Sequence, residues 1–288
     1  MLRFALLLVL GVMPVFAQAQ VTFDKIKGRG QILVGYRDDA APFSYQDDKK
    51  QPIGYSLEFC NAIVARVMAQ PGMTKLKVDY VAIPVDRITT YVSEGSADLF
   101  CSGTSDTAER RKQMAFSQPI YFDGLGVMVR KKDAISKLDQ LKGKKVVLIK
   151  ATTAVAAIDA YQKKSGSGWK LEEVVSSDAA LSQLQLGWAA GYARDKAPLA
   201  LQRASLSAPD EYAILPDLLS SEAIAIAYRK DDPAMKAVVD ATMAEAVASG
   251  KATEWHDKWF TKPIPVGKAQ KSLDLPMSPE LKAAFSKK

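Results

Sequence analysis

Apolar positions follow two different spacings in the first part of the chain. Residues 31–36 form a short apolar run that has the length of a buried strand. In residues 55–68 the apolar side chains Phe59, Ile63 and Val67 recur at every fourth position. The run predicts a strand, and the fourfold spacing predicts a helix that packs one face on a core. The chain therefore opens with a strand followed by a helix.

The same alternation of strand and helix continues to about residue 260. Further strands are predicted at 76–82, 97–101, 146–149, 171–175, 190–193 and 224–228, and helices at 86–93, 153–163, 179–186, 235–248 and 251–260. Gly95 and Gly187 are typical helix ends, and Asp232-Pro233 is a typical helix start. Two α/β units are therefore expected. Two prolines in residues 262–265 indicate that the compact part ends there.

The first residues are typical of a secretory signal peptide. Arg3 gives a positive start, residues 4–16 are uncharged and apolar, and Ala17-Gln18-Ala19 fits a cleavage pattern of small residues. A membrane anchor is the alternative, but the run is shorter than the ~20 residues that span a bilayer. We predict a signal peptide at 1–19 and a periplasmic protein.

Composition narrows the classes of function. The chain has 288 residues, of which 48% are apolar and 25% charged, as in soluble globular proteins. Its net charge of +7 is spread without a polybasic run, so we expect no nucleic-acid partner. The chain has a single histidine, His256, and two cysteines, Cys60 and Cys101. These are too few for the usual metal sites or nucleophilic triads, so we expect no metal, no cofactor and no enzyme.

We interpret the histidine and the two cysteines as structural residues. His256 is expected to be exposed or structurally hydrogen-bonded. Cys60 and Cys101 form either a disulfide or two small buried thiols, and the sequence leaves both possibilities open.

Short motifs occur in a fixed order over nearly the whole chain after residue 31. They are Ile-Leu-Val-Gly-Tyr-Arg at 32–37, Ala-Pro-Phe-Ser-Tyr at 41–45, Pro-Ile-Gly-Tyr-Ser at 52–56, Asp-Arg-Ile at 86–88, the segment 101–110, Ala-Phe-Ser at 115–117, the segment 138–143, Arg-Lys-Asp-Asp-Pro at 229–233 and the segment 255–260. In order and spacing they resemble the family-3 solute-binding proteins of bacterial ABC importers, in the polar amino acid group. Within that family the resemblance is greatest to the glutamate/aspartate binders.

The resemblance implies an α/β fold of the periplasmic-binding-protein type II. Each of two lobes is a mixed sheet flanked by helices, and two crossover strands join the lobes. Lobe one is expected at 22–120 plus 225–288 and lobe two at 121–224. The ligand, glutamate or aspartate, is expected in the cleft between them, captured by clamshell closure. The implied partner is an ABC permease in the inner membrane, and we expect a monomer.

The resemblance also assigns residues to the ligand's α-carboxylate. Arg110 matches the family's clamping arginine, whose planar fork suits a bidentate grip, and Ser105 matches a hydroxyl donor. Thr152 and Thr153 follow a strand and open a helix, where backbone N–H groups can receive an anion. The alternatives are a solvated charge run for Arg110 and plain helix capping for the threonines.

Two further residues are assigned to the ligand's ammonium group. The Gly103 carbonyl and the Asp195 carboxylate match the family's acceptors. The alternative for Asp195 is a cap on the helix that follows it.

Arg37 and Arg87 match the two arginines that contact the acidic side chain in the glutamate/aspartate binders. Two guanidinium groups favour a ligand of net negative charge, because a neutral side chain would leave them uncompensated. The neighbouring Asp38, Asp39 and Asp86 could instead neutralise them, which is the alternative for both arginines.

The chain departs from the family pattern at three positions. Pro84 and Gly103 stand where serines contact the side chain, and the stretch 176–178 (Ser-Ser-Asp) stands where a histidine does. Missing donors leave open an amide, another polar amino acid or a dicarboxylate as ligand. A dehydratase-like enzyme and a sensory binding protein on the same fold are the remaining alternatives.

Overall fold

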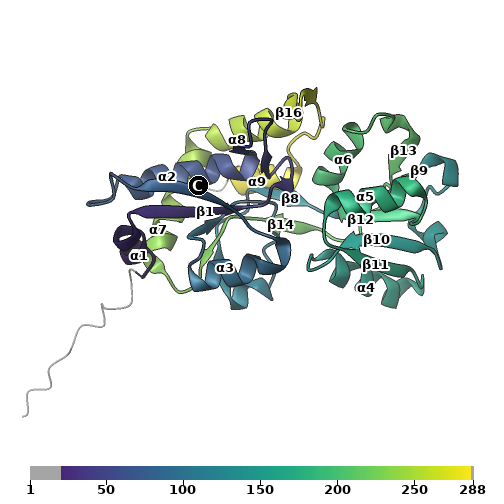
Figure 1. Ribbon diagram of the computed structural model, residues 1–288, viewed down its shortest axis with the longest axis horizontal. Coiled ribbons are helices and arrows are strands. Elements are labelled where there is room, and N and C mark those ends of the chain that lie inside the picture. Colours follow the sequence, from purple (N-terminus) through teal and green to yellow (C-terminus); the bar gives the residue numbers. More distant parts are fainter. Residues whose placement is uncertain (1–20, 287–288) are drawn as a thin grey trace, which may run out of the picture.

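The computed structural model describes residues 21–286, which form two lobes side by side (Figure 1). The predicted signal peptide at 1–19 lies outside the described residues. In the part of the chain that the structure describes, no helix has the length and apolar character needed to cross a membrane.

The first lobe is built on a five-stranded sheet with the order β5-β1-β6-β15-β7. β1 (Gln31–Tyr36) pairs in parallel with β5 (Lys77–Ala82) and β6 (Leu99–Phe100). β15 (Ala227–Arg229) returns between β6 and β7 (Met114–Phe116), antiparallel to both. The sheet is therefore mixed, and one of its inner strands comes from a late segment of the chain.

Helices cover the first sheet because each carries an apolar face. In α2 the side chains of Phe59, Ile63 and Val67 are fully buried, which confirms the predicted helix and its core-facing side. The Asp232 side chain accepts a hydrogen bond from Met235 N at 2.9 Å and caps α7, as predicted. The helices of this lobe are α1 (Val21–Arg29), α2 (Tyr55–Met68), α3 (Ile88–Glu94), α7 (Pro233–Ala248) and α8 (Lys251–His256), and α8 continues as a π-helical turn at Asp257–Thr261.

The second lobe repeats this plan with the strand order β11-β10-β12-β9-β13. β10 (Lys145–Ile149) is parallel to β11 (Lys170–Val174) and β12 (Gly191–Asp195). β9 (Leu125–Arg130) runs antiparallel between β12 and β13 (Tyr212–Ile214). Its helices are α4 (Ala154–Ser165), α5 (Ser177–Leu186) and α6 (Lys196–Ala204). Each lobe is therefore a mixed sheet flanked by helices, as predicted.

Shorter elements complete the two lobes. Three strands form a small sheet in the first lobe: β2 (Asp39–Ala40), β3 (Ser44–Gln46) and β4 (Pro52–Ile53). The 3-10 helices are Val85–Arg87, Arg110–Lys112, Lys131–Asp133, Leu138–Leu141 and Pro209–Glu211.

Two strands carry the chain between the lobes. β8 (Tyr121–Asp123) and β14 (Glu222–Ile224) pair with each other in antiparallel register. The single strand predicted at 224–228 is wrong, because β14 ends at Ile224 and β15 starts at Ala227 in a different sheet. The lobe boundaries, 22–120 plus 225–288 and 121–224, stay a prediction.

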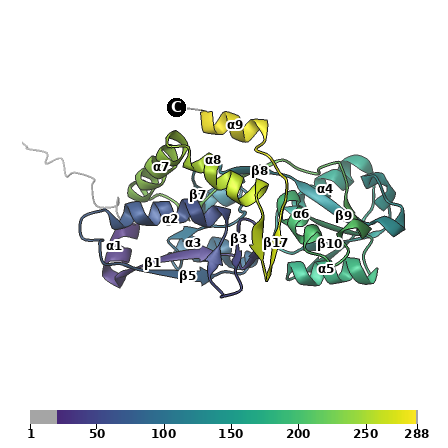
Figure 2. The same cartoon turned by 90° about the horizontal axis from the view of Figure 1, so that it is seen from above.

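The compact part does not end at residues 262–265, so that prediction is wrong. The prolines lie in and beside β16 (Ile264–Val266), which forms a hairpin with β17 (Ala269–Lys271), and α9 (Pro279–Ser286) follows. Ile264 and Leu281 are buried in the first lobe's main apolar cluster. Figure 2 shows α9 on the side of that lobe. Pro265 also accepts a hydrogen bond from the Tyr45 hydroxyl at 2.6 Å.

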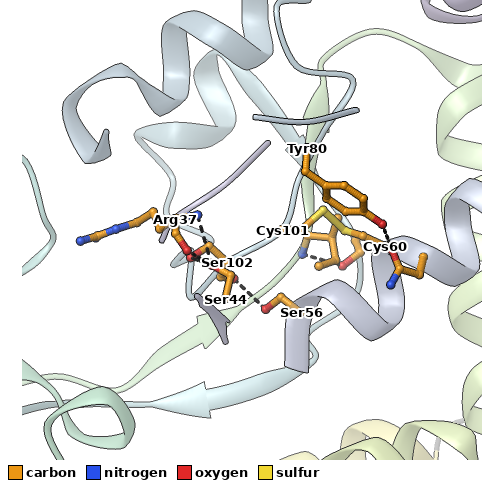
Figure 3. The surroundings of a disulfide bond; sticks show 10 residues. Arg37, Ser44, Ser56, Cys60, Tyr80, Cys101 and Ser102 are labelled. Carbon is orange, nitrogen blue, oxygen red and sulfur yellow. Dashed lines mark hydrogen bonds between the residues drawn. A yellow bond between two sulfur atoms is a disulfide. The ribbon is translucent and has the colours of Figure 1, made fainter. Parts of the chain in front are cut away.

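Cys60 and Cys101 form a disulfide, which settles the alternative that the sequence left open. The bond joins α2 to the residue that follows β6, and both side chains are fully buried (Figure 3). It therefore ties a helix to the central strands of the first sheet.

Candidate ligand-binding site

A small cavity lies between the two lobes. Arg37, Phe43 and Gly103 line it from the first lobe, and Thr152, Arg194 and Asp195 line it from the second. Its volume is about 30 Å³, which is room for about two water molecules. An amino acid is larger, so the lobes must part to admit one.

A wider cavity of about 800 Å³ opens beside the first and shares Arg37 with it. Pro84 and Asp86 line it from the first lobe, and Lys150 and Ser176 line it from the second. The two cavities form one cleft that runs between the lobes to the surface.

Strand ends explain why these residues meet. β1 ends one residue before Arg37, β10 ends three residues before Thr152, and Asp195 is the last residue of β12. In open α/β sheets, ligands bind beyond the carboxyl ends of the parallel strands, and in both lobes those ends face the cleft.

Glycine is required at position 103 by its surroundings. A Cβ atom there would come within 2.8 Å of Phe43 Cδ2, and the Phe43 ring is itself fixed in the core. The cavity wall is therefore backbone at this point, as the predicted contact of a ligand with the Gly103 carbonyl requires.

Of the eight residues predicted from the sequence, four line the cavity: Arg37, Gly103, Thr152 and Asp195. Ser105 and Arg110 do not line it but form a unit in the first lobe, in which Arg110 Nη1 donates to the Ser105 carbonyl at 2.9 Å.

Thr153 and Arg87 lie outside the set of residues that line the cavity. Thr153 is the N-cap residue of α4, although its side chain makes no capping hydrogen bond. Arg87 is exposed at the start of α3. Among residues 21–286 the Arg87 guanidinium has no recorded ion pair or hydrogen bond.

Arg37 is paired with Asp39, which is the alternative that the sequence raised for this arginine. Arg37 Nη2 lies 2.6 Å and Nε 2.8 Å from Asp39 Oδ1. Burial raises the pKa of Asp39, but the charges of Arg37 and Arg194 and two side-chain hydrogen bonds outweigh it and hold the pKa below its usual value. The Asp39 carboxylate is therefore ionised and offsets the Arg37 charge.

The backbone around Arg37 is held by serines. Its N–H donates to Ser44 Oγ at 3.2 Å, and Ser44 Oγ and Ser102 Oγ are 2.8 Å apart and hydrogen-bonded. Ser56 Oγ donates in turn to the Ser102 carbonyl (Figure 3). The side chain of Arg37 extends away from this cluster (Figure 3), which fixes the start of the side chain, while its end pairs with Asp39 at the cavity.

Two partly buried groups of opposite charge lack protein partners in an ion pair. Within the described residues neither Arg110 nor Asp195 forms a salt bridge. Burial lowers the pKa of Arg110 against the raising effect of Glu222 and Asp195. Burial and Glu222 raise the pKa of Asp195 to about 6, against the charges of Arg194, Arg37 and Arg110.

Sequence reasoning missed several charged groups near the cavity. Arg194 lines it directly, while Glu222 and Asp123 lie on the paired crossover strands. Burial and Asp195 raise the pKa of Asp123 to about 7. Arg194 could have been found as a cation at the carboxyl end of the strand predicted at 190–193. Glu222 and Asp123 have no comparable signal in the sequence, because they meet only through the pairing of two strands that are far apart along the chain.

His256 is neither exposed nor hydrogen-bonded, so its predicted environment is wrong. It is fully buried, and neither ring nitrogen has a hydrogen-bond partner in residues 21–286. Its Nδ1 lies 3.7 Å from Asp257 Oδ1, and its ring stacks on Phe260 and Tyr121 at 4.9 and 6.1 Å. Burial lowers its pKa. His256 therefore acts as a packed aromatic ring, because α8 turns it inward.

The same described residues contain no group of three or more His, Cys, Asp or Glu side chains arranged to hold a metal ion.

Comparison with known proteins agrees with the two-lobed architecture. The profile of the family described as "Bacterial extracellular solute-binding proteins, family 3" matches residues 32–262. A "Glutamate/aspartate import solute-binding protein" of Salmonella typhimurium is 34% identical over 264 residues, covering 92% of this chain and 87% of that protein. An "L-glutamate/L-aspartate-binding protein" of Pseudomonas aeruginosa is 33% identical over 91% of this chain and 86% of its own length.

A solved structure shares the fold. The crystal structure of a mutant of ArgBP from T. maritima superimposes with a TM-score of 0.72 at 28% sequence identity, and covers 83% of this chain and 98% of its own.

Proposed function

Because the chain belongs to the family-3 bacterial extracellular solute-binding proteins, we propose that it captures an acidic amino acid, glutamate or aspartate, for an ABC importer. The observation that carries the proposal is a pair of charged groups that form no ion pair within residues 21–286: the Asp195 carboxylate, which lines the cavity, and the Arg110 guanidinium, whose pKa responds to the charge of Asp195. A carboxylate and an ammonium on one ligand supply the charges that these groups lack, at the point where water is excluded. The names of the two relatives support the acidic side chain.

Binding proceeds by closure of the two lobes. The ligand first meets the first lobe, where Arg110 and Ser105 hold its α-carboxylate and the Gly103 carbonyl accepts from its ammonium. The second lobe then adds Thr152 and Asp195. Contacts made only when both lobes touch the ligand shift the population from open to closed.

The remaining parts of the proposal concern location and partners. The buried Cys60–Cys101 disulfide supports an oxidising compartment, as expected for a periplasmic protein with a cleaved signal peptide. The partner is an inner-membrane ABC permease that reads the closed form of a monomeric binding protein. No chemical step is proposed, and turnover of a cyclic carboxylate by the protein would contradict this function.

Calorimetric titration of unfolded, ligand-stripped and refolded protein tests the ligand. We expect glutamate or aspartate to bind with a micromolar or lower Kd, an interaction of about −8 kcal/mol or stronger. Equal or tighter binding of a basic or an apolar amino acid would contradict the proposal.

Two adjacent arginines provide a matched pair of variants. Arg110→Met removes the α-carboxylate partner and should weaken every amino acid ligand about 10- to 100-fold, the usual worth of a hydrogen bond to a charged group. Arg111→Met is the control, because Arg111 lies on the same 3-10 helix but is exposed and paired with Asp106. An unchanged Kd in the Arg110 variant would remove that residue from the site.

A further inference from the structure

Arg194 brings a third guanidinium to the cavity, and it does so from the second lobe. It is the fourth residue of β12, directly before Asp195, and it lines the small cavity together with Arg37. Its side chain is buried, with a relative exposure of 9% for the residue. Arg87, which the resemblance assigns to the ligand's side chain, is exposed and does not line this cavity.

The partners of Arg194 are neutral. Nη2 donates to the backbone carbonyl of Asp39 at 2.8 Å, and Nη1 donates to Gln202 Oε1 at 3.2 Å. Within residues 21–286 no ion pair joins Arg194 to a carboxylate. A buried guanidinium without an ion-pair partner is costly in a low dielectric, so the closed site favours a ligand that brings a negative charge to it.

The carboxylates around Arg194 are already engaged or assigned. Asp39 Oδ1 pairs with Arg37, and its Oδ2 accepts from Ser177 Oγ at 3.1 Å. Asp195 is the proposed partner of the ligand's ammonium. Glu222 acts on Arg110 and Asp195, and its Oε1 accepts from Ser220 Oγ. Asp39 thus makes its direct ion pair with Arg37 and acts on Arg194 only through its charge at longer range, so Arg194 is left as the cation for direct contact with a second carboxylate.

We propose that Arg194, in place of Arg87, is the residue that selects an acidic side chain, and that Asp39 limits this selection by neutralising Arg37. The proposal rests on the proposed function, since it names the residues that distinguish glutamate from glutamine in the same site. Arg110 takes the α-carboxylate, Asp195 the ammonium and Arg194 the side-chain carboxylate. An amide in the last position leaves Arg194 buried and unpaired.

The measured quantity is the ratio of Kd for glutamine to Kd for glutamate, taken by calorimetry on stripped and refolded full chain. Aspartate and asparagine form a second pair. Arg194→Met should lower the ratio about tenfold or more, because it removes a charge-assisted bond that only the carboxylate makes. Arg194→Lys, which keeps the charge, should retain part of the ratio.

A second variant, which should change the Kd ratio in the opposite direction, excludes misfolding as the explanation. Asp39→Asn keeps an oxygen for hydrogen bonding but removes the charge that offsets Arg37, so the ratio should rise several-fold. Arg111→Met, which removes an exposed side chain that is paired with Asp106, should leave the ratio unchanged. A general loss of folding cannot move the ratio in opposite directions in two variants.

Three outcomes would overturn the inference: an unchanged ratio in Arg194→Met, a fall in Asp39→Asn, or a loss of preference in Arg87→Met with Arg194→Met unaffected. Each requires that the wild-type protein prefers glutamate or aspartate over the amide. If the wild type shows no such preference, the proposed ligand itself is wrong, so the two failures are distinguishable.

Discussion

Asp195 occupies an environment that disfavours its ionised form until the ammonium group of a ligand lies beside it. Burial and the charge of Glu222 raise its pKa to about 6, although Arg194, Arg37 and Arg110 all face it and oppose the rise. Asp123, which accepts hydrogen bonds from the N–H groups of Gly124 and Ala197, is also raised, to about 7. An ammonium group beside Asp195 stabilises the ionised form, so ligand binding and proton release are coupled.

This coupling predicts how affinity depends on pH. Below about pH 6 Asp195 is mostly protonated in the empty protein, and the ligand must displace that proton. The Kd should therefore rise with falling pH, by up to about tenfold per pH unit for one proton. Titrations from about pH 5 to about pH 7.5, in buffers of different ionisation enthalpy, measure both the Kd and the protons released.

Asp195→Asn is the check on that assignment. It should bind more weakly at neutral pH and lose the dependence near pH 6. A variant that keeps the wild-type pH profile would show that another group, Asp123 or Glu222, is responsible.

Individual residues that line the cavity were predictable where the local pattern and the family resemblance agreed. Arg37, Thr152 and Asp195 follow or end strands whose apolar runs are plain in the sequence. Arg194 was not predicted, although it stands at the carboxyl end of the strand predicted at 190–193; its contact with the Asp39 carbonyl of the other lobe is visible only in the structure. The pairing of Arg37 with Asp39 was foreseen only as one of two alternatives.

At the scale of elements, the disulfide fixes helix α2 on the first lobe's sheet. It closes a loop between residues 41 positions apart, from α2 to the end of β6. Closing a loop of this length in the unfolded chain is worth about 4 kcal/mol in the chain-entropy treatment. The small cavity between the lobes is lined by other residues, so the bond is expected to contribute to stability rather than to the proposed ligand binding.

The double variant Cys60→Ala/Cys101→Ala should therefore lose about 3–4 kcal/mol of unfolding free energy in urea. Its Kd for the amino acid should stay within about twofold of the wild type at a temperature where both are folded. Oxidised and reduced wild-type protein provide the matched comparison. Equal stability of all forms would contradict the structural role of the bond.

Most elements were predictable because their apolar spacing and end signals are local. Gly95 and Gly187 end α3 and α5 in the left-handed conformation, and Asp232 caps α7, all as the sequence indicates. The errors lie where distant contacts decide. The run at 224–228 is divided between two sheets, and the chain after residue 262 stays compact because it packs on the first lobe.

At the scale of the molecule, the two lobes touch through the paired crossover strands, through Ala197 and Leu201 of α6, which are buried in the first lobe's main apolar cluster, and through a set of polar side chains around Asp39. Ser177 at the start of α5 donates to Asp39 Oδ2, and Arg194 donates to the Asp39 carbonyl. Both donors belong to the second sheet's lobe and the acceptor to the first. Because these bonds join the two lobes, parting the lobes would break them, so they favour the closed form whichever amino acid is bound.

Ser177→Ala should therefore weaken glutamate and glutamine equally, by up to about tenfold, and increase the radius of gyration of the unliganded protein in X-ray scattering. Ser176→Ala is the neighbouring control, because Ser176 Oγ accepts from Ala179 N and caps α5 instead. That variant should lose stability without a change in radius. A change in the preference between the two ligands in Ser177→Ala would show a direct contact with the ligand.

The small volume between the two halves also determines how a bound ligand is released. Because the small cavity of about 30 Å³ is smaller than an amino acid, the two halves must move further apart whenever a ligand enters or leaves. The residence time of the ligand is then governed by how often the two halves separate, not by diffusion of the ligand. A transporter that forces the two halves apart controls release. A ligand that is held tightly in solution can then still be released quickly at the membrane.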